Sequence, residues 1–213
     1  MPWRVLAAAT VLALGCRKPQ ADGLANDTVG VRSVADSANP KQASAAIHAA
    51  MQSRAAEVLD ALAAHDMIRL AALVDPREGV RFSPYAHVSA SDVVLDREQV
   101  ARLWSDTTRR VWGTADGSGE PLRLSFPEYY RRFVFNADFR RAPRVAHDSL
   151  PIGTGNTPNN IREAFPGAHV VEYHFSGFDA KYGGMDWSSL WVVLRHGTTG
   201  WYLVGLVHGS WTI

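Results

Sequence analysis

The sequence predicts an α+β fold in which N-terminal helices pack on a curved antiparallel β-sheet. The segment from Gln42 to Ala64 is rich in strong helix formers, and its apolar residues recur at helical spacing. The last third of the chain instead contains three runs of β-branched and aromatic residues. Helices that precede strands, without regular alternation between them, are typical of the α+β class.

The first helix is predicted to be amphipathic. Its apolar residues are spaced so that they lie along one face of the helix. These residues are Ile47, Met51, Val58, Leu59 and Leu62.

Shorter helices are marked by their capping residues. Asp66 is an N-cap candidate for a second helix that ends before Pro76. Asp96 is an N-cap candidate for a helix up to Trp104, and Pro127 favours a helix start in the segment 126–135. Between these helices, the run "GVRFSPY" is predicted to be a strand.

The three late runs are predicted to form an antiparallel meander. They read "AHVVEYHFSGF", "SSLWVVLRH" and "WYLVGLVHGSWTI", and "GTTG" at 197–200 is a hairpin turn between the last two. Strict alternation along the last strand puts one set of residues on a common face. This set is Trp201, Leu203, Gly205, Val207, Gly209, Trp211 and Ile213.

The N-terminus has the layout of a secretory signal. Arg4 precedes an apolar stretch from Val5 to Leu14, which is shorter than the roughly 20 residues that a membrane-spanning helix needs. The residues Ala13, Leu14, Gly15 and Cys16 resemble the lipobox of bacterial lipoproteins. This resemblance implies that Cys16 is acylated, for example with palmitate, and holds the protein at the bacterial cell envelope. The alternative is an ordinary signal peptide, which would leave a secreted protein with one free thiol.

The chain is therefore divided into a signal peptide at 1–15, a lipidated N-terminus with a flexible tether at 16–41, and one domain at 42–213. A single cysteine excludes an internal disulfide. Loss of residues 1–15 removes only Arg4 from the 22 basic residues, which leaves 21 against 21 acidic ones. This neutral balance argues against a nucleic-acid partner.

The segment "AEVLDALAAHDMIRLAALVDPREGVRF", at 56–82, resembles the start of the nuclear transport factor 2-like domains of the cystatin-like class. The stretches "WGTADGSGEPLRLSFPEYYRRFVF", "YGGMDWSSLWVVL" and "GWYLVGLVHGSWTI" resemble uncharacterised bacterial secreted and lipid-anchored proteins. The resemblance implies a cone with a pocket at its open end. Members of the superfamily use such a pocket for ligand binding, for isomerase or dehydratase chemistry, or for pairing with a second copy.

Catalytic candidates are weak. Alternation along the first late strand puts Glu172 and His174 on one face, where they could form a general acid–base pair. We favour an exposed, solvated pair on the outer face of the sheet. His208 is either a core histidine or a residue of the pocket wall. The sequence contains no Gly-x-Ser-x-Gly and no His-Glu-x-x-His, and we expect no metal and no cofactor.

The sequence thus favours an envelope lipoprotein that binds a small hydrophobic or aromatic ligand, or a partner protein, over an enzyme. With seven tryptophans and six tyrosines, an aromatic-lined cavity is expected. The residues expected in its wall are Tyr85, Trp112, Trp187, His208 and Trp211. Two alternatives stay open: a small hydrolase or isomerase that uses Glu172 with His174, or His208, and a homodimer formed through the sheet.

Overall fold

The computed structural model describes residues 40–211, and these residues form the predicted α+β fold. The predicted signal peptide, Cys16 and most of the predicted tether lie outside the described residues. The helices are α1 (Pro40–Ala63), α2 (Met67–Leu73), α3 (Arg97–Arg102), α4 (Phe126–Phe133) and α5 (Ile161–Ala164), with 3-10 turns at Phe139–Arg141 and Ala180–Tyr182. The strands are β1 (Val80–Ser83), β2 (Val93–Leu95), β3 (Arg110–Thr114), β4 (Pro121–Leu124), β5 (Arg144–His147), β6 (His169–Phe175), β7 (Ser188–Gly197) and β8 (Gly200–Ser210).

The predicted starts of α2, α3 and α4 are confirmed, and those of α2 and α3 depend on a local capping bond. The Asp66 side chain accepts a bond from the backbone of Arg69, at the start of α2. Asp96 caps α3 in a reciprocal arrangement with Gln99, and α4 carries proline in its first turn. These caps satisfy N–H groups that have no partner inside the helix.

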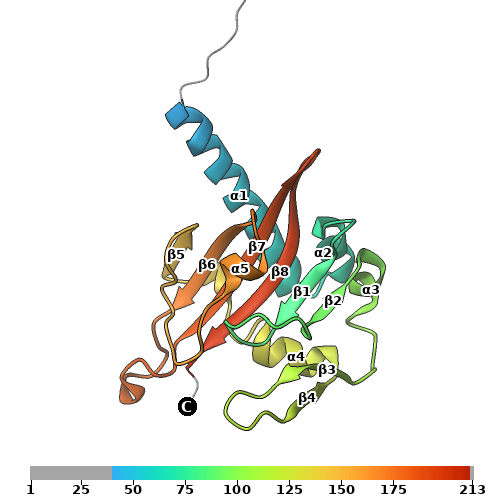
Figure 1. Cartoon of the computed structure of the whole chain (residues 1–213), viewed down its shortest axis with the longest axis vertical. Coiled ribbons are helices and arrows are strands. Elements are labelled where there is room, and N and C mark those ends of the chain that lie inside the picture. The colour runs from blue at the N-terminus through green and yellow to red at the C-terminus, as the bar shows by residue number, and fades with distance from the viewer. Residues whose placement is uncertain (1–39, 212–213) are drawn as a thin grey trace, which may run out of the picture. The chain divides into compact units, whose positions relative to one another are not determined.

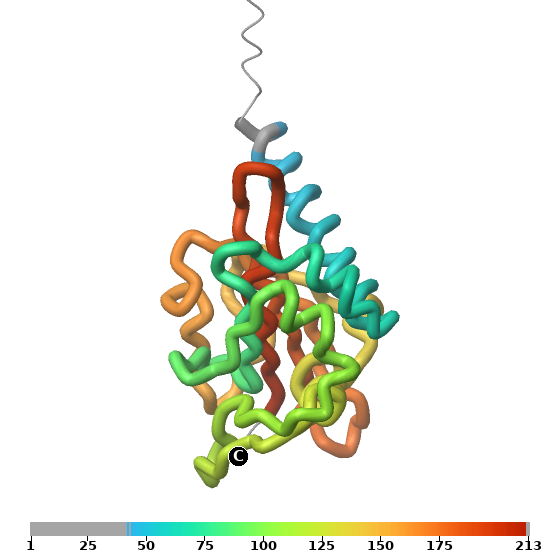
Figure 2. Tube along the Cα trace, turned by 90° about the vertical axis from the view of Figure 1, so that its right-hand side faces the viewer, coloured from blue at the N-terminus to red at the C-terminus, as the bar shows by residue number. Residues whose placement is uncertain are grey.

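The first turns of α1 do not pack against the core. Residues 44–50 are exposed, and the buried face of the helix begins at Met51. Figure 1 shows that this end of α1 projects past the strands. Ile47, which the sequence pattern places on the apolar face, is therefore exposed. Figure 2 shows the tip of the β7–β8 hairpin at the same end of the domain.

The main sheet has the strand order β2-β1-β8-β7-β6-β5. The meander β6–β7–β8 is confirmed, and Gly197 pairs with Gly200 across the predicted hairpin turn. The sheet is not wholly antiparallel, since β1 runs parallel to β8 with Phe82 opposite Leu206. The glycine-rich stretch at 112–121 belongs to a separate β3–β4 hairpin.

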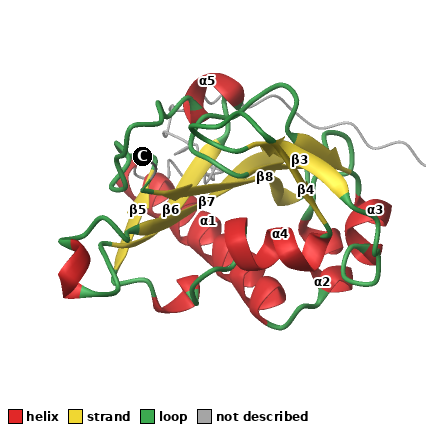
Figure 3. Cartoon of the chain, turned by 90° about the horizontal axis from the view of Figure 1, so that it is seen from below, coloured by secondary structure: helices red, strands yellow, loops and turns green. Residues whose placement is uncertain are grey.

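Both faces of the main sheet are covered. In Figure 3 the helices α1, α2 and α4 lie on one side of the strands, while α5 and long connecting segments lie on the other. We call these sides the helix face and the loop face. The helix face carries the larger apolar cluster, which includes Val171, Leu190, Val192 and Leu206. The loop face carries a smaller cluster with Phe165, Trp191, Val193 and Val207.

A β-bulge in β8 changes which residues share a face. Val193 pairs with Gly205, but the next residue, Leu194, pairs with Leu203, so Val204 is the extra residue. As a result Trp201 and Leu203 pack on the helix face, opposite Gly205, Val207 and Gly209. The strict alternation expected for this strand is therefore wrong before Gly205, because a bulge shifts the period by one residue.

Candidate functional site

The loop face of the sheet holds a buried polar network. Alternation along β6 correctly places Glu172 and His174 on one face, and both lie on the loop face opposite β7. Their exposed fractions are only 3% and 4%, so the exposed, solvated pair that we expected is wrong. Residues 148–160 cover them, and this segment has no periodicity from which its position could have been predicted.

Ser189 joins these two side chains. Its hydroxyl donates to Glu172 Oε1 at 2.7 Å and lies 2.8 Å from His174 Nδ1, whereas Nδ1 and Oε1 are 3.9 Å apart. Because the serine proton is used toward Glu172, Nδ1 of His174 must be the donor to Ser189. Burial lowers the pKa of His174, with Arg144 acting in the same direction and Glu172 opposing it. His174 is therefore a neutral ring in this network at neutral pH.

The network holds the covering segment in place. Glu172 also accepts backbone N–H bonds from Ile152, at 2.6 Å, and from Gly153, at 2.8 Å. In a hydrolytic triad the histidine stands between the serine and the acid. Here the serine stands between the acid and the histidine, and its hydroxyl is committed to both. The arrangement is a structural latch and does not provide an activated nucleophile.

Three hollows lie in a row beside this latch. The first, of about 170 Å³, adjoins the latch and is lined by acidic and basic side chains that include Asp148, Arg162, Glu163 and Glu172. The second, of about 180 Å³, shares Pro151 and Asn159 with the first. The third, of about 360 Å³, shares Tyr85 and Thr157 with the second. The shared walls make the row one interrupted groove.

The second hollow is aromatic. Two of the residues that were predicted for the wall of a ligand cavity, Tyr85 and Trp187, line this hollow. Glycines let the indole of Trp187 approach the backbone: a Cβ on Gly153 would lie 2.5 Å from its ring, and one on Gly155 would lie 3.2 Å from it. The indole nitrogen of Trp187 is buried and has no hydrogen-bond partner in the described part of the chain.

The third hollow is formed by the β1–β2 connection and the β3–β4 hairpin, and its most buried polar side chain is Asp92. Oδ2 of this carboxyl accepts bonds from the Ser83 hydroxyl, at 2.6 Å, and from the Ser89 backbone, at 2.8 Å. Burial raises the pKa of Asp92, although those two bonds and the charges of Arg81 and His87 oppose the shift. The carboxyl is thus nearer to its protonation point than an exposed aspartate would be.

A tyrosine hydroxyl without a partner lies in the core next to this hollow. Tyr129 is fully buried, and its hydroxyl has no hydrogen-bond partner within residues 40–211. Burial raises the pKa of Tyr129, and the neighbouring Asp92 and Tyr85 raise it further. The phenol therefore stays neutral at all physiological pH values.

Neither Asp92 nor His87 is predicted as a site residue. The sequence around them, "SPYAHVSASD", shows a strand followed by a polar turn, which is the commonest use of such residues. The available signal is an aspartate beside several small hydroxyl residues, a pattern that also marks ordinary turns. Only the fold places Asp92 next to Ser83 and the β3 backbone.

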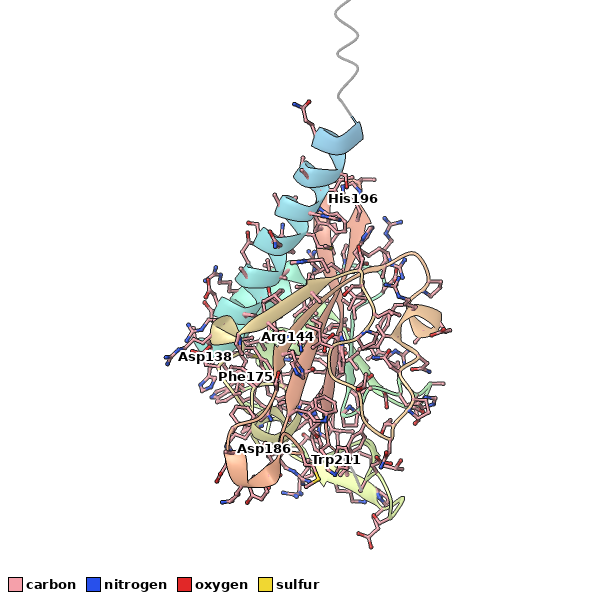
Figure 4. The ribbon with its side chains drawn as sticks, turned by 90° about the vertical axis from the view of Figure 1, so that its left-hand side faces the viewer. Asp138, Arg144, Phe175, Asp186, His196 and Trp211 are labelled. Carbon is pink, nitrogen blue, oxygen red and sulfur yellow. The ribbon has the colours of Figure 1, made fainter. Side chains whose placement is uncertain are left out.

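The other expected wall residues lie elsewhere. Trp112 is fully buried, stacks on Tyr129 with ring centroids 4.2 Å apart, and donates its indole N–H to Leu124 O. His208 lies on the helix face, edge-on to Phe133. These are core positions, since the space between helices and sheet that the cone resemblance reserves for a cavity is filled by aromatic rings. Trp211, 41% exposed, follows β8 at the end of the domain opposite His196 (Figure 4).

Two further findings concern the described residues as a set. No helix within residues 40–211 has both the length and the apolar composition needed to cross a membrane. In the same range, no three His, Cys, Asp or Glu side chains converge in a way that could hold a metal ion.

Comparison with known proteins gives a structural likeness at low identity. No family model and no curated protein matches the chain. A domain of unknown function with a cystatin-like fold from Nostoc punctiforme PCC 73102 is similar, with 12% identity over 79% of each chain and a TM-score of 0.36. A structure from Catenulispora acidiphila is similar over 79% of this chain and 94% of the other, with 16% identity and a TM-score of 0.37. The function of this chain must therefore be inferred from its own residues.

Proposed function

We propose that this protein binds a small organic ligand in the groove formed by the second and third hollows. The observation that carries the proposal is that Tyr85 lines both hollows, with Trp187 on one side and Asp92 on the other. Ligand sites are mostly apolar hollows with a few converging polar groups, and the volume of the third hollow lies within their usual range.

The rest of the groove supports a binding role. Its walls are supplied by separate segments, from the β1–β2 connection, the β3–β4 hairpin and residues 151–159, which the Glu172 latch holds in place. A hollow whose walls are already fixed by hydrogen bonds loses little conformational entropy when a ligand enters. The core on the helix face, in contrast, is filled by side chains.

The test is a screen of small molecules for a rise in melting temperature, followed by affinity measurement from tryptophan fluorescence. A ligand of the folded state raises stability by RT ln(1 + [L]/Kd). We expect Tyr85→Ala to weaken binding by about tenfold, since it removes an aromatic contact worth on the order of 1 kcal/mol or more. Trp187→Phe should weaken binding by a smaller factor, since a smaller aromatic ring remains.

Trp211→Phe is the matched control, because Trp211 is exposed beyond the end of β8. This control variant should bind the ligands with the same affinity as the unchanged protein. The proposal fails if no compound stabilises the domain. It also fails if the stabilising compounds bind Tyr85→Ala and Trp187→Phe as tightly as they bind the unchanged protein.

We further propose that the domain is held at the bacterial envelope through acylated Cys16. The support is the apolar stretch from Val5 to Leu14, which is followed by Gly15 directly before this cysteine. Detergent phase separation and mass spectrometry of the membrane fraction test it, since two or more acyl chains anchor a protein firmly. Cys16→Ser should move the protein to the soluble fraction and remove the acyl mass. An unacylated chain in the soluble fraction without any substitution would contradict this.

A further inference from the structure

We propose that the third hollow selects a positively charged ligand group, an alkylammonium or guanidinium, which Asp92 binds through Oδ1. The ligand class is then an arylalkyl amine or guanidine, with its charged end in the third hollow and its apolar body toward Tyr85 and Trp187. This inference rests on the proposed function and names the chemistry of the ligand.

Asp92 has one oxygen that is occupied and one that is available. The residue is 6% exposed and lines the hollow. Oδ2 takes both bonds, from Ser83 and Ser89. Oδ1 has no hydrogen-bond partner in the described part of the chain, and it lies 3.5 Å from the position that a Cβ on Gly113 would occupy. Because Gly113 carries no side chain, the space in front of Oδ1 stays clear.

Asp92 Oδ1 is open to the third hollow, so the hydrogen-bond donor of a ligand can reach it. Charge-assisted hydrogen bonds are shorter and stronger than those between neutral groups. An ammonium or guanidinium group brings both the missing donor and the opposite charge. A neutral hydroxyl would supply only the donor, and a carboxylate would repel the ionised Asp92.

The charges around the hollow agree with a cationic ligand. Among residues 40–211, its lining contains a second carboxylate, Asp116, and one histidine, His87, but neither lysine nor arginine. Asp116 takes part in the wall, where it accepts bonds from the Thr157 hydroxyl and the Gly117 backbone. The nearby cation Arg81 donates to Ser89 O. Opposite charges in a partly enclosed site attract more strongly than in bulk water.

The aromatic side chains define the rest of the ligand. Tyr85 lies on the boundary between the two hollows, so a chain of a few atoms that leaves Asp92 passes its ring. Cations are also attracted to the faces of aromatic rings within about 6 Å. Beyond Tyr85, Trp187 and the glycines around it offer an apolar surface for an aryl group.

The experiment is isothermal titration calorimetry with 2-phenylethylamine and 2-phenylethylguanidine, compared with neutral 2-phenylethanol and anionic 3-phenylpropionate. We expect both cations to bind about tenfold or more tightly than the alcohol, and the carboxylate not to bind. Asp92→Asn keeps the volume and an oxygen for Ser83 and Ser89, but it presents an NH2 group toward the ligand. We expect this variant to bind the two cations no more tightly than it binds 2-phenylethanol.

The pH dependence adds a second readout. Burial raises the pKa of Asp92, so lowering the pH toward that pKa should protonate the carboxyl and weaken binding of the cations. The groups that face Asp92 are Ser83 and Arg81 of β1, His87 and Ser89, and Tyr129 of α4. The Asp92→Asn variant should lose this pH dependence, because it has no carboxyl group to protonate.

Glu163→Gln is the matched control, because this exposed carboxylate lines the first hollow and not the third. It should bind the cations as the unchanged protein does. Equal affinity for amine and alcohol, or equal affinity of Asp92→Asn and the unchanged protein for the amine, overturns the inference. Neutral aromatic ligands that bind while the cations do not would overturn it and leave the proposed function intact. If none of the four compounds binds, this inference fails, and the small-molecule screen decides separately on the proposed function.

Discussion

Replacing Glu172 with alanine is expected to destabilise the domain by roughly 3 to 5 kcal/mol. Three donors converge on this buried carboxylate: the backbone N–H groups of Ile152 and Gly153, and the hydroxyl of Ser189. Each buried donor that loses its partner costs on the order of 1 to 3 kcal/mol. His174 loses its orientation as well, since it reaches Glu172 through Ser189.

Urea unfolding followed by tryptophan fluorescence measures the change, as a shift of the midpoint at constant slope. Hydrogen exchange of the Ile152 and Gly153 amides gives a local readout, and both should exchange much faster in the variant. Glu172→Gln keeps the side-chain volume but places an NH2 group against at least one of the three donors. It should therefore fall between the alanine variant and the unchanged protein.

Glu163→Ala removes a carboxylate that lines the first hollow but is exposed, so its effect should stay within about 0.5 kcal/mol. If Glu172→Ala proves as stable as Glu163→Ala, the latch does not hold the segment 148–160.

The same variants connect stability to binding. A released segment removes one wall of the second hollow, so Glu172→Ala should also lose the ligands that the groove binds.

The sequence could predict features that depend on residues close together in the chain, and it could not predict features that depend on distant segments. The capping residues Asp66 and Asp96 act within three residues, and both helix starts follow from the sequence. The period-2 pattern of β6 places Glu172 and His174 on one face. Which face is buried depends on a covering segment without any pattern, and this is why their burial is not predicted.

Longer-range effects explain the other differences. The bulge at Val204 depends on the packing of β8 against β7, and it changes the face of Trp201 without any mark in the alternating pattern. Trp112 is of a residue type that often lines ligand sites, yet it lies in the core, where Tyr129 from a different element stacks on it. Asp92 becomes a site residue because the β3–β4 hairpin places Gly113 beside its free oxygen.

The stability of the domain is expected to fall by about 3 kcal/mol between pH 7 and pH 4 through His208 alone. This ring is 2% exposed, and burial lowers its pKa to about 4, only partly opposed by its bond to Pro84 O. The pKa of histidine in an unfolded chain is about 6.5. Between these two values the unfolded state binds a proton that the folded state does not, so acid favours unfolding. The stabilisation is complete above pH 6.5 and is lost as the pH falls toward 4.

Within the described part of the chain, no carboxylate acts on His208 to stabilise the charged ring. Its Nδ1 lies 3.2 Å from Pro84 O, and its Nε2 lies 3.4 Å from the Ser188 hydroxyl, which also bonds Asn136. The carbonyl requires a donor at Nδ1, so the neutral ring has Nε2 as its acceptor. A second proton would have to enter at Nε2, where Ser188 can turn its oxygen toward it but brings no charge.

The measurement is the free energy of unfolding in urea at a series of pH values, for the unchanged protein and for His208→Gln. Other groups also titrate: burial lowers the pKa of His174 and raises that of Asp92, and these effects have opposite signs. The difference between the two curves isolates His208, because the other groups are common to both. Glutamine costs stability at pH 7, but the gap between the curves should shrink by about 3 kcal/mol toward pH 4. Parallel curves would contradict the prediction, because they would mean that His208 binds its proton as readily in the folded core as in the unfolded chain. Ser188 and solvent would then have to solvate the charged ring, although the ring of Phe133 packs against it.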